Sequence, residues 1–162
     1  MNTQEQMQQI GQAAKQASRH LARLSSRKKN SILEAMADAL EANRSAIQEA
    51  NAKDLAAGKE AGLAAAMLDR LELNDARIDG MIKGLHDGAV LNHPVGEGLT
   101  PWNRPNGLHI RKVRAPIGVI GIIFESRPNV TCDAAALCFK TSNAVILRGG
   151  KEAIHSNLAI AK

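Results

Sequence analysis

Two short turns carry the side chains of this sequence that could bind an anionic ligand. One apolar run ends in Glu125, Ser126 and Arg127, and a second ends in the turn Arg148-Gly149-Gly150-Lys151. Guanidinium and ammonium groups form charge-assisted hydrogen bonds with phosphates, and glycines let the backbone approach a ligand closely. The two turns therefore indicate an anion pocket. The alternative is that the basic side chains only cap helices or face water.

The elements around these turns predict that both lie at one edge of a sheet. Residues 116–124 and 144–147 are apolar and rich in β-branched side chains, as in strands buried on both faces. A helix between them is expected to begin at Pro128 and to end at Ser142-Asn143. Strands joined in this way are parallel, so their carboxyl ends meet at the edge where ligands bind. A further helix, opening at Glu152 and still running at Lys162, is expected to point its N-terminal N–H groups at the same place.

The first ninety residues predict five helices, because apolar residues recur at three- and four-residue steps. Their expected inward positions are Met7, Ile10, Ala14, Ala17, Leu21 and Leu24, then Ile32, Met36, Ala39 and Leu40, then Ile47, Ala50 and Leu55 in a helix from Arg44 to Lys59, then a short helix from Ala64 to Leu71, and finally Ile78, Ile82 and Leu85. Ser25-Ser26 and Asn74 are predicted N-caps, and Gly58 or Gly62 is the predicted end of the third helix.

The segment after Asn92 changes in character. Residues 92–107 are rich in proline and glycine and are predicted to form a loop, in which Trp102 is expected to be a packing lid. Residues 108–113 alternate imperfectly between apolar and polar, which predicts a half-exposed strand.

Composition limits the functional classes. Hydrophobic residues make up 44%, the net charge is +5 and the sequence pI is near 9.5, which permits an anionic partner without naming one. The sequence lacks the basic run with interleaved aromatic residues that would indicate nucleic-acid binding. No apolar run approaches the ~18 residues that are needed to span a membrane. The polar N-terminus is unlike a signal peptide, so a cytoplasmic protein is expected. Cys132 and Cys138 fit neither a redox pair nor a zinc site, and the five histidines lack ligand spacing.

Two long motifs resemble the γ-glutamyl phosphate reductase family, which belongs to the aldehyde dehydrogenase superfamily. The motifs run from Val113 to Thr131 and from Lys140 to Ala153. Two helical segments, Asn51-Ala52-Lys53-Asp54 and Met67-Leu68-Asp69-Arg70-Leu71, are similar to the family as well. The resemblance therefore extends over essentially the whole chain.

The resemblance implies an activity and a cofactor. Members of the family reduce L-glutamyl 5-phosphate with NADPH to L-glutamate 5-semialdehyde and phosphate in proline biosynthesis. A cysteine thiolate displaces the phosphate and hydride then reduces the thioester. The catalytic cysteine of the family is expected beyond position 162, and neither Cys132 nor Cys138 matches it. No catalytic residue is therefore assigned within this chain.

The resemblance also assigns binding roles by position. It places Glu125, Ser126, Arg148, Gly149, Gly150 and Lys151 in the cofactor site. Arg148 is expected near the adenosine ribose and Lys151 near the extra phosphate of NADPH. Arg127 and Asn129 are expected to contact the carboxylate or phosphate of the substrate. No metal is expected.

The fold implied is α/β, with a helical segment followed by the start of an aldehyde-dehydrogenase-like, Rossmann-type parallel sheet that is incomplete. The expected parts are a helical segment (residues 1–91), a loop and strand (92–115) and part of an NADP-binding domain (116–162), as in an N-terminal fragment. A fragment of this kind should expose apolar surface, aggregate and lack reductase activity, whereas the full-length form should be a homo-oligomer. Two alternatives stay open: another reductase of the superfamily, or a non-enzymatic basic helical module that binds nucleic acid or protein.

Overall fold

The computed structural model describes residues 2–162 and contains seven α-helices in these residues. In chain order the elements are α1 (Thr3–Leu21), α2 (Ser26–Ala42), α3 (Arg44–Glu60), α4 (Ala65–Leu71), α5 (Asp75–Val90), β1 (Trp102–Asn103), β2 (His109–Ile110), β3 (Val119–Ile123), α6 (Asn129–Lys140), β4 (Ala144–Arg148), a 3-10 turn η1 (Lys151–Ala153) and α7 (Ile154–Ile160). No helix among the described residues is long and apolar enough to cross a membrane.

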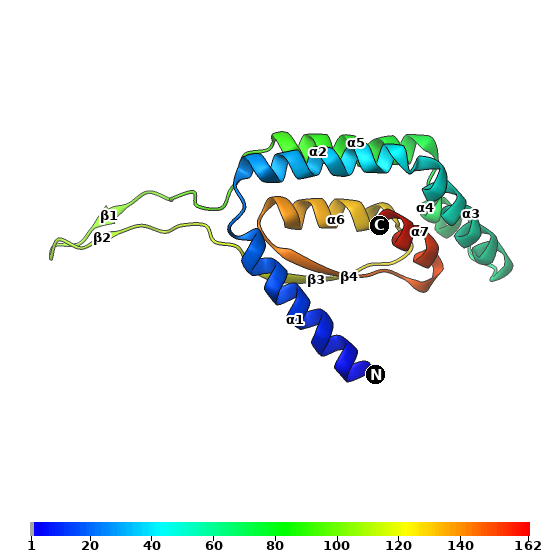
Figure 1. Ribbon diagram of the computed structural model, residues 1–162, viewed down its shortest axis with the longest axis horizontal. Coiled ribbons are helices and arrows are strands. Elements are labelled where there is room, and N and C mark those ends of the chain that lie inside the picture. The colour runs from blue at the N-terminus through cyan, green and yellow to red at the C-terminus, as the bar shows by residue number, and fades with distance from the viewer. Residues whose placement is uncertain (1) are drawn as a thin grey trace.

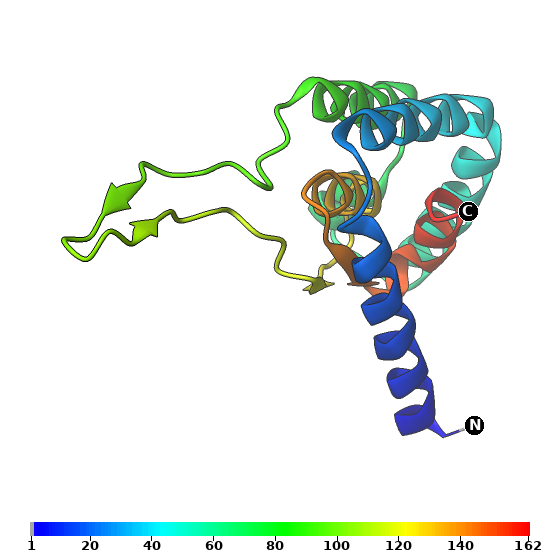
Figure 2. The same ribbon diagram turned by 60° about the vertical axis from the view of Figure 1, so that its left-hand side comes forward.

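The elements form layers around α6 (Figure 1). Helices α2 and α5 lie side by side and cover α6 on one side, and α6 in turn covers the sheet of β3 and β4. Helix α1 crosses the opposite face of that sheet, and α3 packs against α7 (Figure 2). The predicted α/β class, with a helical segment followed by a small parallel sheet, is confirmed.

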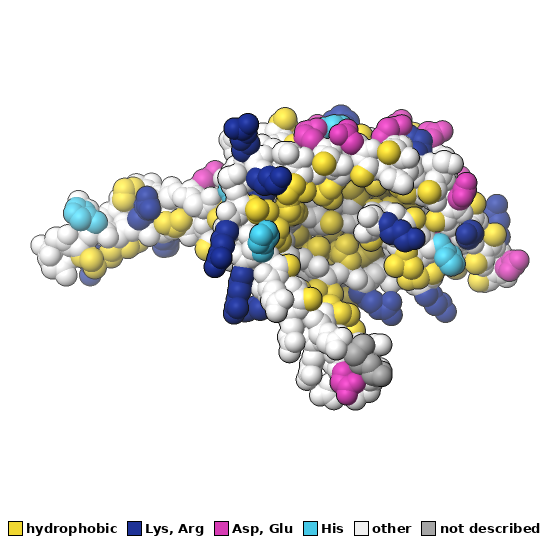
Figure 3. All heavy atoms as spheres, viewed as in Figure 1, with side chains coloured by type: hydrophobic (Ala, Val, Ile, Leu, Met, Phe, Trp, Pro, Cys, Tyr) yellow, Lys and Arg dark blue, Asp and Glu magenta, His cyan; other side chains and the backbone are white. Residues whose placement is uncertain are grey.

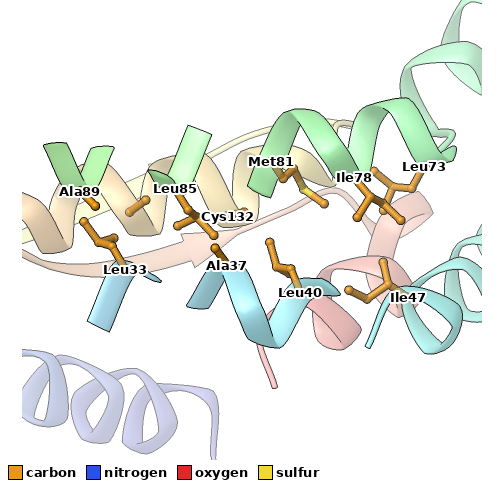
Figure 4. Packing of buried hydrophobic residues seen from close by; sticks show 11 residues of the cluster. Leu33, Ala37, Leu40, Ile47, Leu73, Ile78, Met81, Leu85, Ala89 and Cys132 are labelled. Atoms are coloured by element: carbon orange, nitrogen blue, oxygen red, sulfur yellow. The ribbon is translucent and has the colours of Figure 1, made fainter. Parts of the chain in front are cut away.

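The core lies between α2, α5 and α6 (Figure 4). It consists of Leu33, Ala37, Leu40, Ile47, Leu73, Ile78, Met81, Leu85, Ala89, Cys132 and Ala136. The small side chains of Ala37, Ala89 and Ala136 let the helices approach closely. The predicted inward face of α2 is confirmed for Leu40 and for Met36, which packs against the core. It was wrong for Ala39, which is exposed, and it left out Leu33 and Ala37, which are buried. Met7 on α1 is 56% exposed, so the expected apolar stripe of α1 is mostly outward.

Three predicted helix boundaries are confirmed, two by capping hydrogen bonds and one by its backbone conformation. The Ser25 hydroxyl accepts from the backbone N–H of Lys28 at 3.3 Å, and the side chain of Asn74 accepts from that of Arg77 at 3.0 Å. Gly62 ends the third helical segment with a φ of 71°, a left-handed conformation that favours glycine.

Strands β3 and β4 are parallel, as predicted, in a register that runs from Val119 opposite Ala144 to Ile123 opposite Arg148. The expected burial on both faces was wrong for β3, in which Ile123 is 86% exposed. The physical reason is incomplete cover: within residues 2–162 the sheet has two strands, so β3 and β4 each have one unpaired edge.

Residues between α5 and β3 form an arm that projects from the layers (Figure 1). The predicted loop contains the short strand β1, which pairs antiparallel with β2, and Gly98 forms an isolated bridge with Val113. The predicted strand over 108–113 is therefore reduced to His109–Ile110 plus this bridge. Trp102 lies in β1 and is 41% exposed, so the expected packing lid was wrong.

Candidate functional site

The two candidate turns begin side by side. The backbone N–H of Phe124 donates to the carbonyl of Arg148 at 3.0 Å, directly after the last paired residues of β3 and β4. The prediction that both turns start at one edge of the sheet is confirmed.

The first turn divides its side chains between the interior and the solvent. Ser126 is 3% exposed, whereas Glu125 and Arg127 are exposed. The backbone N–H of Arg127 donates to the carbonyl of Glu125 at 2.9 Å, which closes the turn before α6. A ligand at this edge can therefore reach the side chains of Glu125 and Arg127 directly.

The second turn presents two basic side chains. Arg148 and Lys151 are both exposed, and no ion pair within residues 2–162 involves either of them. Arg148 only donates to the neighbouring carbonyl of Gly149, at 3.2 Å. Because neither cation is engaged in an ion pair in the described part of the chain, both can form charge-assisted hydrogen bonds with an anionic group.

The two glycines of this turn leave no room for a larger residue, because side chains of Asn157 and Glu152 lie against them. A Cβ at Gly149 would lie 2.2 Å from Asn157 Nδ2, and one at Gly150 would lie 2.3 Å from Glu152 Oε1. Glu152 therefore folds over the turn and brings a negative charge to it. The sequence analysis did not select Glu152, and its position next to Lys151 was the available signal.

The prediction that a helix points free N-terminal N–H groups at this turn was wrong. The segment after Gly150 is a 3-10 turn, and α7 begins at Ile154 and ends at Ile160. The first N–H groups of α7 are occupied, since Asp54 accepts from the backbone of His155 at 3.2 Å and of Ser156 at 2.7 Å. This carboxylate, on α3, takes the place that the sequence analysis gave to a ligand.

Arg127 and Asn129 line a pocket of their own. It has a volume of about 600 Å³ and lies between α6 and the α4–α5 segment. None of the six cofactor candidates lines it. The residues predicted for substrate are thus brought together, on a different side of the first turn from Arg148 and Lys151.

Two buried lysines were missed by the sequence analysis. Lys29 is fully buried, donates to the Ser142 hydroxyl and lies 3.4 Å from Nε2 of His93. Lys140 is 3% exposed and donates to Asn30 Oδ1 at 2.7 Å and to the Ala89 carbonyl at 2.9 Å. The pKa of both ammonium groups is lowered, chiefly by burial. The spacing of Lys29 from Leu33 and Ala37, on one helix face, was the available signal.

His93 joins these lysines to the root of the arm. Its Nδ1 lies 2.9 Å from the carbonyl of Lys140, so Nδ1 carries the hydrogen and Nε2 accepts from Lys29. Burial, and then the charge of Lys29, lowers the pKa of His93. The neutral imidazole is therefore the form that this contact requires.

Neither cysteine has the character of a nucleophile. Cys132 and Cys138 are both buried, and burial followed by the charge of Asp133 raises the pKa of Cys132 to about 12. Burial also raises the pKa of Cys138. No group of His, Cys, Asp and Glu among the described residues could hold a metal ion.

An apolar groove of about 730 Å³ opens between α2, α3, α6 and α7. Figure 3 shows the hollow, in which hydrophobic side chains gather below the α2 layer. Leu158 beside it is 56% exposed. The expectation of exposed apolar surface is met here and at Ile123.

A parallel β–α–β unit between helical layers, with basic turns at its carboxyl edge, defines a protein of the α/β class. The family description "Aldehyde dehydrogenase family" matches residues 1–162, and the chain belongs to that family.

Curated relatives are more specific in name. The chain is 57% identical over 162 residues to γ-glutamyl phosphate reductase of Moorella thermoacetica, and 57% identical over 161 residues to that of Geotalea daltonii. These matches cover 100% and 99% of this chain but 39% and 38% of the relatives. The chain thus spans about two fifths of their length.

Solved structures agree with the fold. Crystal structures named γ-glutamyl phosphate reductase, from Thermotoga maritima and Saccharomyces cerevisiae, superpose with TM-scores of 0.87 and 0.91 at 44% and 42% identity. The matches cover 91% and 95% of this chain and 36% and 39% of those chains. A Bacillus subtilis protein named a putative aldehyde dehydrogenase, at 18% identity and a TM-score of 0.70, shares the fold.

Proposed function

We propose that the protein that carries this chain reduces L-glutamyl 5-phosphate to L-glutamate 5-semialdehyde, with NADPH as the reductant, in proline biosynthesis. The similarity to γ-glutamyl phosphate reductases over the whole chain carries the proposal. The unpaired basic side chains at the carboxyl edge of the sheet support it, because both ligands bear phosphate. Self-association of the complete protein and a cytoplasmic location are expected with it.

The cofactor would be held at the second turn. NADPH supplies the hydride when it is bound. Arg148 and Lys151 are proposed to contact its adenosine end by charge-assisted hydrogen bonds, while Gly149 and Gly150 keep the turn tight. Glu125 and Ser126 are proposed to border the same site from the first turn.

The nucleophile is proposed to lie outside residues 1–162. A thiolate is required to displace phosphate from an acyl phosphate, and burial keeps the thiols of Cys132 and Cys138 protonated. Residues 1–162 alone are therefore expected to catalyse no reduction.

The test is an assay of NADPH oxidation by the protein that carries this chain, with L-glutamyl 5-phosphate generated in place from L-glutamate and ATP by a glutamate kinase. Oxidation that depends on both the kinase and the protein is expected. Oxidation no faster than without the kinase would overturn the proposal. Faster turnover with L-aspartyl 4-phosphate would instead favour another reductase of the superfamily.

A further inference from the structure

The pocket of about 600 Å³ beside the first turn carries charges of both signs. Its lining includes Arg70 and Arg77 from the α4–α5 segment, and Arg127, Asn129 and Asp133 from the start of α6. A carboxylate in the lining weakens the binding of a simple anion, because like charges repel. The mixture of charges calls for a different occupant.

The cations of the pocket are not equivalent. Arg77 is committed to the fold, since it donates to the Glu72 carbonyl at 2.9 Å and pairs with Asp69 at 3.0 Å. Arg70 and Arg127 are exposed and enter no ion pair within residues 2–162. Two guanidinium groups, one from each side of the pocket, are therefore free to bind a carboxylate.

Of the two carboxylates that line the pocket, Asp69 pairs with Arg77, whereas Asp133 has no cation partner among residues 2–162. Asp133 is half-buried, and its Oδ2 accepts from Asn129 Nδ2 at 3.0 Å. No ion pair within the described residues involves it. Its Oδ1 points toward Gly84 on α5, where an added Cβ would still lie 3.8 Å away. A partly desolvated carboxylate with one neutral donor is poorly compensated, and an ammonium group would correct this.

We infer that this pocket binds the α-amino-acid end of the substrate, with Arg70 and Arg127 holding the α-carboxylate and Asp133 holding the α-ammonium group. The inference rests on the proposed function and adds to it the residues that hold the amino-acid end of the substrate, away from the reacting acyl phosphate. Asn129 positions Asp133 through the hydrogen bond to Oδ2. A ligand lacking either charged group leaves one sign of the pocket unmatched.

The test is a titration of the ¹⁵N-labelled protein that carries this chain, followed at the Asn129 side-chain amide and the backbone amides of residues 127–133. The probes are L-glutamate, glutarate (no ammonium), 4-aminobutyrate (no α-carboxylate) and inorganic phosphate. Saturable shifts with L-glutamate are expected, with glutarate and 4-aminobutyrate about tenfold weaker or more, since each lacks one charged contact.

Variants assign the two contacts. Asp133→Asn should weaken L-glutamate and leave glutarate unchanged, whereas Arg127→Gln should weaken both. Arg104→Gln, in the arm, is the matched control and should change neither. Equal binding of glutarate and L-glutamate, binding of phosphate alone, or no saturable shift at residues 127–133 would each overturn the inference. Failure of the proposed function is distinct, because it would show as absent NADPH oxidation while L-glutamate still binds here.

Discussion

Asp54 accepts hydrogen bonds from both the backbone N–H and the hydroxyl of Ser156, at 2.7 and 2.6 Å, across 102 positions of sequence. One turn earlier on α3, the side chain of Asn51 donates to the same hydroxyl at 3.0 Å and also accepts from the N–H of Leu73 at 2.8 Å. The motif Asn51-Ala52-Lys53-Asp54 therefore has a structural role. It fastens the start of α7 and the link between α4 and α5 to one buried helix face.

Removing Asp54 should destabilise the protein strongly. In Asp54→Ala the buried N–H and hydroxyl of Ser156 lose their acceptor, and we expect the free energy of unfolding to fall by about 3 kcal/mol. Urea unfolding followed by circular dichroism measures this. The control is Asp38→Ala on the exposed face of α2, which should cost less than about 0.5 kcal/mol. Equal losses in the two variants would contradict the role of Asp54.

The His93 contact predicts a stability that depends on pH. Burial, and then the charge of Lys29, lower the pKa of His93 in the folded state. The hydrogen bond to the Lys140 carbonyl and the charge of Glu97 oppose this shift, and the charge of Lys140 adds to it. The unfolded chain takes up this proton near pH 6.5, before the folded chain does, so stability is lost as the pH falls below about 6.5. The urea concentration at the midpoint of unfolding should therefore fall as the pH is lowered from about 7.5 to about 5, a range that brackets the value of about 6.5.

In His93→Gln this fall should be smaller, whereas His20→Gln, at an exposed position on α1, should keep the wild-type slope. A slope in His93→Gln as steep as in the wild type would rule out His93 as the source.

The cysteines should be unreactive in the folded state. With a pKa of about 12 for Cys132, its thiolate is scarce at neutral pH, and burial blocks reagents as well. We expect a thiol-specific disulfide reagent to react at least about a hundredfold more slowly than in urea. A Cys138→Ser variant isolates Cys132. Rapid reaction of the folded variant would show that Cys132 is an accessible nucleophile after all.

Gly149→Ala should be costly for a steric reason. The added methyl group would displace Asn157, whose Oδ1 accepts from the Thr131 hydroxyl at 3.0 Å, and would press on Phe124. We expect a loss of about 1–3 kcal/mol in the free energy of unfolding. Gly11→Ala is the control, because nothing lies within 4 Å of a Cβ there and alanine favours a helix. It should leave stability unchanged or higher, and a similar loss in both variants would exclude the steric explanation.

Arg148 provides the sharpest test of the cofactor assignment. In the protein that carries this chain, Arg148→Ala should raise the KM for NADPH, because one charge-assisted contact contributes about 1.5–3 kcal/mol. Arg104→Ala, in the arm, should leave it unchanged. An unaltered KM in Arg148→Ala would mean that the exposed guanidinium serves another purpose.

Local features of the sequence predicted local structure well. Ser25 and Asn74 cap helices, and Gly62 ends one, because each acts on backbone groups a few residues away. The strand–helix–strand unit and the parallel direction of its strands followed from two apolar runs joined by one helix. The binding roles of Glu125, Ser126, Arg127, Asn129, Arg148, Gly149, Gly150 and Lys151 remain predictions.

Contacts between distant residues could not be predicted. Periodicity gives a helix its apolar face but not the partner of a polar residue on that face, so Lys29 was overlooked and Asp54 was valued only as part of a motif. The prediction of free helix N–H groups after Gly150 was wrong for the same reason. A carboxylate from α3 occupies that helix terminus, and nothing near residue 152 encodes it.

The burial of the Lys29 ammonium group also depends on the order in which the chain is synthesised. Its partner Ser142 lies 113 positions later, and at a synthesis rate of about 5–20 residues per second it follows Lys29 by roughly 6–23 s. Helices α2 and α5 can pair during that interval, but Lys29 must stay hydrated until Ser142 emerges. Asp54 likewise stays hydrated until its partner Ser156 has been synthesised. Emergence of residues 142–156 from the ribosome is therefore the event that dehydrates both charged side chains and commits the layers to their final packing.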